Sequence, residues 1–159
     1  MTKTSISRAR KGDLRALEEI YRSPELKTSL REARWFVRCY FDYHHILVAK
    51  VDGKVRGACF WRIEGEEYSG LGWVENLWVE QADRRRGLGE LLLRRTIEEM
   101  GDHYARRGVR LRRIMLTTQD ERTSARRLYR RAGFELRARL GDLYGPRAKD
   151  LVYVLEVGR

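Results

Sequence analysis

The chain is poor in the residues and patterns that mark several specialised classes of protein. It has only two cysteines, Cys39 and Cys59, which lie far apart and form no Cys-x-x-Cys pair. We interpret them as reduced core residues of a cytoplasmic protein rather than as part of a disulfide framework. The histidines and cysteines show no metal-ligand spacing, so the sequence predicts no metal site.

Long apolar runs are also missing. No stretch of about 18 consecutive apolar residues is present, so we expect no membrane span. The first residues, MTKTSISRARKGD, lack the apolar core of a secretory signal. Repeats, low-complexity tracts, linkers and recognised nucleic-acid motifs are absent as well. We therefore expect residues 1–159 to form a single domain.

Positive charge is in excess. The formal net charge is +11, and 28 of the 34 basic residues are arginine. Such a charge attracts polyanions, whether a phosphorylated cofactor, an acidic protein or nucleic acid. Basic charge without a groove-reading element predicts only salt-sensitive, non-specific binding to nucleic acid, so we expect no specific nucleic-acid partner.

One stretch, Trp73 to Met100, combines a strand, a basic glycine turn and a helix. Residues 73–79 are apolar on both faces, as in a strand buried from both sides. The turn Arg84-Arg85-Arg86-Gly87-Leu88-Gly89 follows, and then leucines, an isoleucine and a methionine recur at helical spacing. A helix that opens at such a turn presents free backbone N–H groups and the positive end of its dipole. This predicts an anion site suited to phosphate.

The rest of the chain alternates strands and helices. Asp13 is expected to cap a first helix that Ser23-Pro24 ends, and a second helix is expected over about 25–41. Asp52-Gly53 between two apolar runs predicts a hairpin. Asp120 or Thr123 can cap a last helix, which Gly133 ends. Further strands are expected at residues 6–9, 45–51, 54–63, 113–117, 134–140 and 150–157.

Two motifs in this order resemble one known family. The turn at residues 84–89 matches (Arg/Gln)-x-x-Gly-x-(Gly/Ala), and residues 125–134 match Ala-x-x-Leu-Tyr-x-x-x-Gly-Phe. Both are signatures of the GNAT superfamily of acetyl-CoA-dependent N-acetyltransferases, which the chain resembles over essentially its whole length. The resemblance implies an α/β (α+β) fold with a mixed, mostly antiparallel sheet of six to seven strands flanked by four helices.

The resemblance also implies how acetyl-CoA is held. Backbone N–H groups of the turn would bind the pyrophosphate, and the pantetheine arm would pair with the end of the preceding strand. Arg122 stands where many relatives have an asparagine that contacts the coenzyme, and it could reach a coenzyme phosphate instead. The predicted coenzyme-binding residues are Leu77, Trp78, Val79, Arg84, Arg85, Arg86, Gly87, Leu88, Gly89, Glu90 and Arg122.

Two residues are predicted to move protons. By resemblance, Tyr129 donates to the sulfur of the leaving coenzyme, although a tyrosine on this helix stripe could also be a core residue. Glu75 shares a strand face with apolar residues, so we expect it to be partly desolvated and to act as the base. A salt-bridged structural role for Glu75, with a water chain as the base, is the alternative. Some relatives carry a catalytic glutamate where this chain has Thr117.

The acceptor site is framed, in this family, by two loops. The residues expected to contact the acceptor are Tyr21, Glu25 and Tyr144. A tyrosine in the last loop resembles protein N-terminal acetyltransferases, which favours a protein or peptide amine over a small-molecule amine. A non-catalytic basic module that binds acyl-CoA or nucleic acid is the third hypothesis, but such a module needs neither Glu75 nor Tyr129. The protein is expected to be a monomer or a homodimer.

Overall fold

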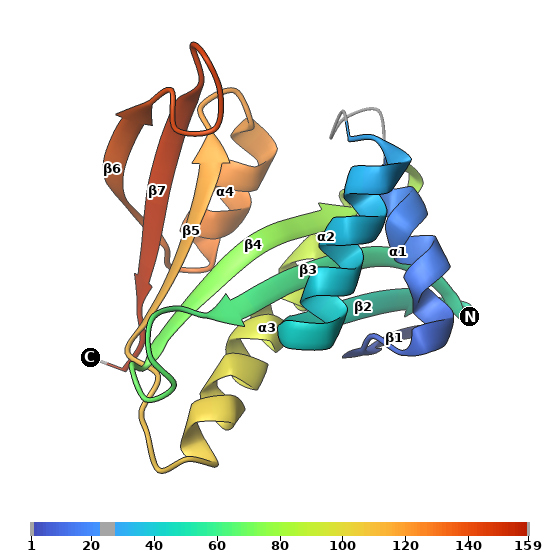
Figure 1. The fold of residues 1–159 in the computed structure, drawn as a ribbon, viewed down its shortest axis with the longest axis horizontal. Helices are drawn as coiled ribbons and strands as arrows, with labels where there is room; N and C mark the ends of the chain where they lie inside the picture. Colours follow the sequence, from blue (N-terminus) through green and yellow to red (C-terminus); the bar gives the residue numbers. More distant parts are fainter. Residues whose placement is uncertain (1, 23–27, 159) are drawn as a thin grey trace. The chain divides into compact units, whose positions relative to one another are not determined.

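The computed structural model describes residues 2–22 and 28–158 as four α-helices and seven β-strands (Figure 1). Their order along the chain is the predicted one. The elements are β1 (Thr4–Arg8), α1 (Leu14–Tyr21), α2 (Leu30–Tyr43), β2 (His45–Val51), β3 (Lys54–Ile63), β4 (Leu71–Val79), α3 (Leu88–Ala105), β5 (Arg113–Gln119), α4 (Thr123–Arg131), β6 (Glu135–Gly141) and β7 (Lys149–Glu156).

The strands form one sheet in the order β1-β2-β3-β4-β5-β7-β6. β4 and β5 pair in parallel, whereas β1 with β2, β2 with β3, β5 with β7 and β6 with β7 pair antiparallel. This confirms the predicted mixed, mostly antiparallel sheet. By their internal contacts the residues fall into two compact units, Met1–Trp61 with Asn76–Thr96 and Arg62–Glu75 with Ile97–Arg159.

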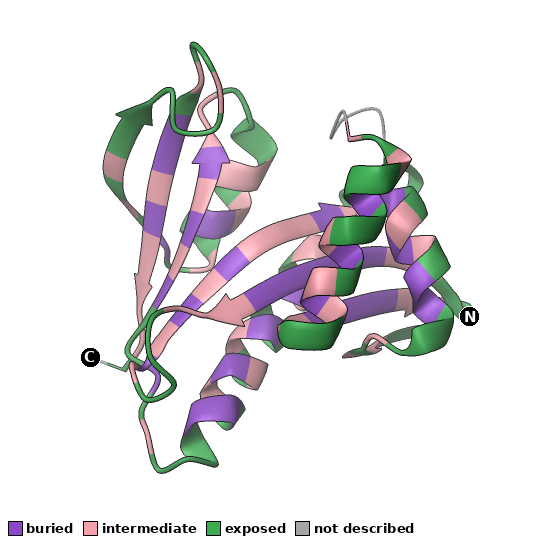
Figure 2. Cartoon of the chain, in the orientation of Figure 1, coloured by how far each residue is buried: buried purple, intermediate pink, exposed green. Residues whose placement is uncertain are grey.

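In the first unit, α1 and α2 cover one face of β2 and β3 (Figure 1). The apolar stripe of each helix meets alternate strand residues, which are buried (Figure 2). On the other strand face, Gly57 is needed for close packing. A Cβ there would lie 3.0 Å from the side chain of Leu92 in α3 and 3.0 Å from the carbonyl oxygen of Trp78. The core residues of this unit's helical face are Leu14, Leu17, Val37, Tyr40, Ile46, Val48, Ala58 and Phe60.

The predicted hairpin between β2 and β3 is present, with Asp52 at φ +50° and Gly53 at φ +79°. Positive φ at both central residues is what a two-residue hairpin turn of type I′ requires, and Asp-Gly is a preferred pair for it.

In the second unit, β4 pairs with β5 over Leu71–Val74 and Arg113–Leu116, and β7 and β6 follow. Tyr104 near the end of α3 is fully buried, and its hydroxyl donates to the Leu71 carbonyl oxygen at 2.7 Å. α4 packs on the sheet through Tyr129, whose ring centroid is 6.3 Å from that of Tyr153 in β7.

One helix start and one helix cap differ from the prediction. α2 begins at Leu30, because Ser29 and Glu32 form a capping box with N–H to oxygen distances of 3.2 and 2.7 Å. α1 does begin directly after Asp13, which occupies the N-cap position, but the Asp13 side chain makes no capping bond. Its carboxylate instead accepts from the Arg10 N–H at 2.9 Å and pairs with the Lys50 ammonium at 2.7 Å.

The start of α4 is the third correction. Its N-cap position is Arg122, without a side-chain capping bond, so neither Asp120 nor Thr123 is the cap. Asp120 is held by Arg126 at 2.9 Å instead. Gly133 does end the helix, at φ +92°, as predicted.

Candidate active site

The glycine turn between β4 and α3, in the first unit, leads directly into the first turn of a helix. Arg85 and Gly87 both adopt left-handed backbone, with φ of +63° and +79°. The first helical bond of α3 runs from Leu91 N to Gly87 O at 3.0 Å. The N–H groups of Leu88, Gly89 and Glu90 therefore have no acceptor within the helix. Together with the helix dipole, such a turn favours a bound anion.

Two of the three arginine side chains of the turn contact other parts of the first unit. Arg84 Nε donates to the Val79 carbonyl oxygen at 2.9 Å, and its guanidinium lies 5.7 Å from the centroid of the Trp78 ring. Arg86 pairs at 3.1 Å with Asp83, which is buried. The binding of an anion by the N–H groups of the turn stays a prediction.

A further arginine reaches the same carboxylate. Arg56 in β3 lies 3.7 Å from Asp83, which connects the turn to the sheet of this unit. The Glu80 N–H also donates to the Arg56 carbonyl oxygen at 2.7 Å, at the end of β4. Arg56 and Asp83 are supporting residues that the sequence did not single out, because only the folded sheet brings them together.

The predicted pantetheine-binding residues lie at the end of β4. Trp78 is buried, whereas Leu77 and Val79 are only partly buried. Arg122 is exposed at the start of α4, and its Nε donates to the Gln119 side-chain oxygen at 3.4 Å. The roles of these residues toward a coenzyme stay predictions.

Glu75 is partly buried in β4, with 29% of its side chain exposed, and it forms an ion pair and hydrogen bond with Arg62 of β3. The salt bridge that we considered as an alternative is therefore present. It does not by itself decide between a structural carboxylate and a base, since a paired carboxylate can still accept a proton from a ligand on its free side.

Glu75 and Thr117 lie on the same face of the sheet. Trp73 of β4 pairs in register with Met115 of β5, and side chains two residues apart along a strand share a face. The register of the two strands ends at Val74 and Leu116, and both strands continue beyond it. This face thus carries the predicted base and the threonine that replaces a family glutamate.

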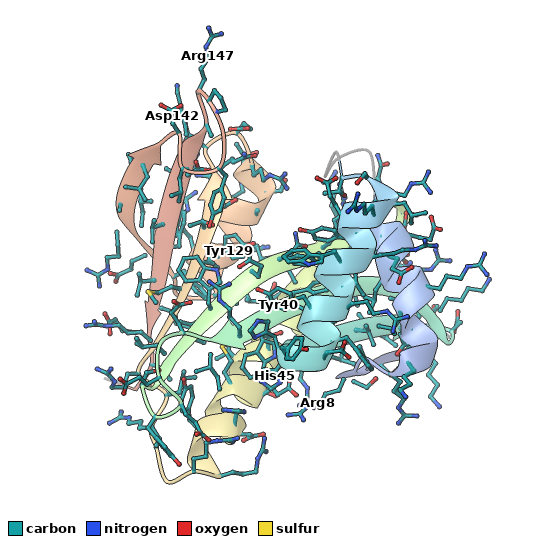
Figure 3. The ribbon with its side chains drawn as sticks, viewed as in Figure 1. Arg8, Tyr40, His45, Tyr129, Asp142 and Arg147 are labelled. Atoms are coloured by element: carbon teal, nitrogen blue, oxygen red, sulfur yellow. The ribbon has the colours of Figure 1, made fainter. Side chains whose placement is uncertain are left out.

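Tyr129 is on the other face. Leu116 pairs in register with Tyr153, which places Tyr153 opposite to the Thr117 side of the sheet. Tyr129 is buried, and its ring centroid lies 6.3 Å from Tyr153 and 6.0 Å from Phe134 (Figure 3). The two predicted proton-transfer residues therefore flank the sheet of the second unit from opposite sides.

A guanidinium supports the helix that carries Tyr129. Arg126 Nε lies 3.4 Å from the Tyr153 hydroxyl oxygen, and its Nη1 donates to Asp120 at 2.9 Å. The hydrogen bond with Tyr153 raises the pKa of Arg126 above its ordinary value, so this side chain stays charged at all working pH values.

Of the predicted acceptor residues, Tyr144 is 61% exposed in the loop between β6 and β7. Its hydroxyl lies 3.4 Å from the Thr117 hydroxyl, and its N–H donates at 3.2 Å to buried Asp150. Arg147 and Asp142 brace the same loop, since the Arg147 N–H donates to the Asp142 carboxylate (Figure 3). The loop thus brings Tyr144 to the face that bears Glu75.

Tyr21 belongs to an aromatic cluster in the first unit. Its ring stacks on Phe36 with centroids 4.0 Å apart, and Phe60 lies 6.0 Å away. Phe36 was not predicted, although its place on the helix stripe beside Tyr40 is visible in the sequence. Glu25 lies outside the described residues.

Two general features complete the site's surroundings. A hollow of about 220 Å³ in the second unit contains none of the predicted site residues among those that line it: Asp120, Arg139, Leu140, Gly141, Lys149, Asp150 and Leu151. Among residues 2–22 and 28–158, no cluster of three or more His, Cys, Asp or Glu side chains could hold a metal ion. No helix in the same part of the chain is long and apolar enough to cross a membrane.

Comparison with known proteins agrees with the geometry. The model of the acetyltransferase (GNAT) family matches residues 14–134, so the chain belongs to this family and is an acetyltransferase. Both motifs that carried the resemblance lie within the matched range.

Solved structures share the fold at low identity. The ribosomal-protein-S18-alanine N-acetyltransferase of Escherichia coli is 20% identical, with a TM-score of 0.79 over 99% of this chain and 96% of that one. The protein yncA of Salmonella typhimurium, solved with its cofactor acetyl-CoA, is 19% identical, with a TM-score of 0.74 over 98% and 95%. A protein assigned as a phosphinothricin N-acetyltransferase is 17% identical, with a TM-score of 0.80 over 99% and 100%.

Proposed function

We propose that this acetyltransferase moves the acetyl group of acetyl-CoA to a primary amine of a protein or peptide, either an N-terminal α-amine or a lysine. The observation that supports acetyl-CoA as the acetyl donor is the turn at residues 85–90, where left-handed residues and a helix start present several N–H groups to one point. This is the arrangement that a pyrophosphate needs. The exposed Tyr144 beside Thr117 supports a peptide acceptor.

The reaction is a direct attack. The amine nitrogen forms a bond to the thioester carbon, and the C–S bond breaks without an acetyl-enzyme. Glu75 accepts the proton that the amine loses, and Tyr129 donates a proton to the coenzyme thiolate. A backbone N–H near Leu77 to Val79 stabilises the oxyanion of the tetrahedral intermediate. The fold is shared by acetyltransferases named for a protein acceptor and for phosphinothricin, so the choice of a peptide acceptor is based on Tyr144 and not on the fold.

Binding of the donor is tested by thermal unfolding. Acetyl-CoA at 100 times its Kd should stabilise the protein by about 2.7 kcal/mol, which raises the Tm by several degrees. A folded protein whose Tm does not respond to millimolar acetyl-CoA would contradict the proposed donor.

The acceptor is tested by coenzyme release in a panel of amines. The panel holds peptides with a free N-terminal alanine, serine or methionine, an N-terminally blocked peptide with a free lysine, and small amines including phosphinothricin. The proposal predicts turnover of at least one peptide class above every small amine. Preference for a small amine would reassign the acceptor, and no turnover with retained acetyl-CoA binding would favour a non-catalytic binding module.

A further inference from the structure

Arg62 stands at the centre of a side-chain cluster on the Glu75 face of the second unit. Its guanidinium donates to the Glu75 carboxylate and lies 3.0 Å from Glu64. It also lies 5.1 Å from the centroid of the Trp73 ring. The glycine turn and the tyrosine motif both lie far from Arg62 in sequence, so neither signature includes it.

The three contacts restrain Arg62 in different directions. The indole face restricts the tilt of a planar guanidinium that lies over it. The N–H donors of the guanidinium then point outward within the plane of the guanidinium. The backbone reinforces this arrangement, because the Glu64 N–H donates to the Leu71 carbonyl oxygen at 3.0 Å. About a quarter of the Arg62 side chain is exposed, so the contacts are only partly screened by solvent.

The consequence for Glu75 is a fixed position. Its carboxylate is bound to the Arg62 guanidinium, and the same guanidinium contacts Trp73 and Glu64. The Glu75 side chain is therefore held in one orientation on this face, which a base needs in order to meet the proton of an attacking amine.

We propose that Arg62 is the positioning residue of the acceptor face, where its guanidinium, which lies over Trp73 and beside Glu64, orients Glu75 to take the amine proton. This rests on the proposed function, since it concerns the base of that reaction. The cluster of two carboxylates and one guanidinium has a net charge of −1 in a chain of +11. It therefore offers an incoming ammonium a locally negative site.

A double-mutant cycle tests the coupling. Arg62→Met, Glu75→Gln and the double variant are compared with the wild type by coenzyme release, with a peptide bearing a free N-terminal alanine as the probe. We expect Arg62→Met alone to lower kcat about tenfold, because one charge-assisted hydrogen bond to Glu75 is lost. When Glu75→Gln is already present, adding Arg62→Met should lower kcat less than about twofold. Equal losses in both backgrounds would overturn the proposal.

A comparison of kcat with KM and two further variants separate positioning from a general structural effect. Arg62→Met should lower kcat and leave the KM for acetyl-CoA unchanged, because the proposal places Arg62 against the base and not against the coenzyme. Arg62→Lys, which keeps the charge, should restore part of the rate. Arg113→Met removes another paired arginine on the same face of the sheet, 2.9 Å from Glu156, and should leave both kcat and KM unchanged.

A measurement without turnover keeps this inference distinct from the proposed function. In ¹⁵N-labelled wild-type protein at pH 7, the two Nη groups of Arg62 should give separate resonances, because the contacts slow rotation of the guanidinium. They should merge in Glu75→Gln, while those of Arg113 do not change. An averaged Arg62 signal in the wild type overturns the proposal whether or not any amine is acetylated. Separate signals in a protein that acetylates no amine would instead refute the proposed function alone.

Discussion

Replacing Gly87 with alanine tests whether the turn before α3 binds the coenzyme through its backbone. Gly87 has φ +79°, and a Cβ built there meets no atom within 4 Å. The substitution therefore strains the backbone without a steric clash. The new methyl group would stand at the turn whose N–H groups a phosphate must approach closely.

Gly53 provides a matched control in the same unit. It also has φ +79° and no atom within 4 Å of a built Cβ, but it lies in the β2–β3 hairpin. Left-handed backbone costs a non-glycine residue about 1–2 kcal/mol, so both variants should lose about that much unfolding free energy. In a chain of this size each kcal/mol lowers the Tm by about 2–4 °C.

The affinity for acetyl-CoA should separate the two variants. Loss of one charge-assisted hydrogen bond to the pyrophosphate removes about 1.5–3 kcal/mol, which weakens binding about 10- to 100-fold in Gly87→Ala. Gly53→Ala should bind acetyl-CoA like the wild type. Isothermal titration well below both Tm values measures the difference. Equal affinities in the two variants would refute the assignment of the turn as the pyrophosphate site.

Three other substitutions have defined outcomes. Tyr129→Phe should lower kcat about 100-fold in steady-state assays and leave the acetyl-CoA Kd within twofold, because only the proton donor is lost. The hydrogen bonds from Ser29 lower the pKa of Glu32, so the stability that this carboxylate contributes is present above its ordinary pKa of 4.5 and is lost as the pH falls through the lowered pKa; Glu32→Gln should reduce the Tm at pH 7, and by progressively less as the pH falls further below 4.5. Gly72→Ala would place a Cβ 2.6 Å from the Met100 sulfur and should cost about 1–3 kcal/mol in denaturant unfolding.

Each of these three substitutions has a matched control variant. Tyr43→Phe changes an 80% exposed tyrosine of α2 and should leave kcat unchanged. Glu121→Gln removes an exposed carboxylate before α4 and should leave the Tm at pH 7 unchanged. Gly101→Ala, inside α3 with no atom within 4 Å, should stabilise the protein by about 0.5–1 kcal/mol, the opposite sign to Gly72→Ala. A loss of stability in Gly101→Ala would show that the contacts of a built Cβ do not predict the effect of alanine in α3.

The order of elements was predictable from the sequence because each element carries a local signal. Asp52-Gly53 can adopt the two positive φ values of a tight hairpin, and apolar runs on either side define β2 and β3. Gly133 marks the end of α4 for a similar reason. The start of α2 was misplaced because helical periodicity extends upstream of residue 30, whereas the capping box of Ser29 and Glu32 is the stronger signal.

The site was predictable only where a motif is contiguous. The turn at residues 84–89 could be predicted as an anion site because its glycines and the start of the next helix are adjacent in the sequence. Arg62 and Asp83 could not be found in this way, because their partners come from other strands and the pairing depends on register. Asp13 illustrates the same limit. Its position just before a helix suggested that its side chain caps the helix, but the carboxylate forms an ion pair with Lys50 of β2 instead.

The place where the β4–β5 pairing ends has a consequence for the proposed reaction. The two strands are in register only as far as Val74 and Leu116, and Glu75 and Thr117 follow directly. If Glu75 and Tyr129 act as proposed, two groups on opposite faces of this part of the sheet must reach one thioester. The end of the strand pairing is the point at which one bond would be accessible from both faces.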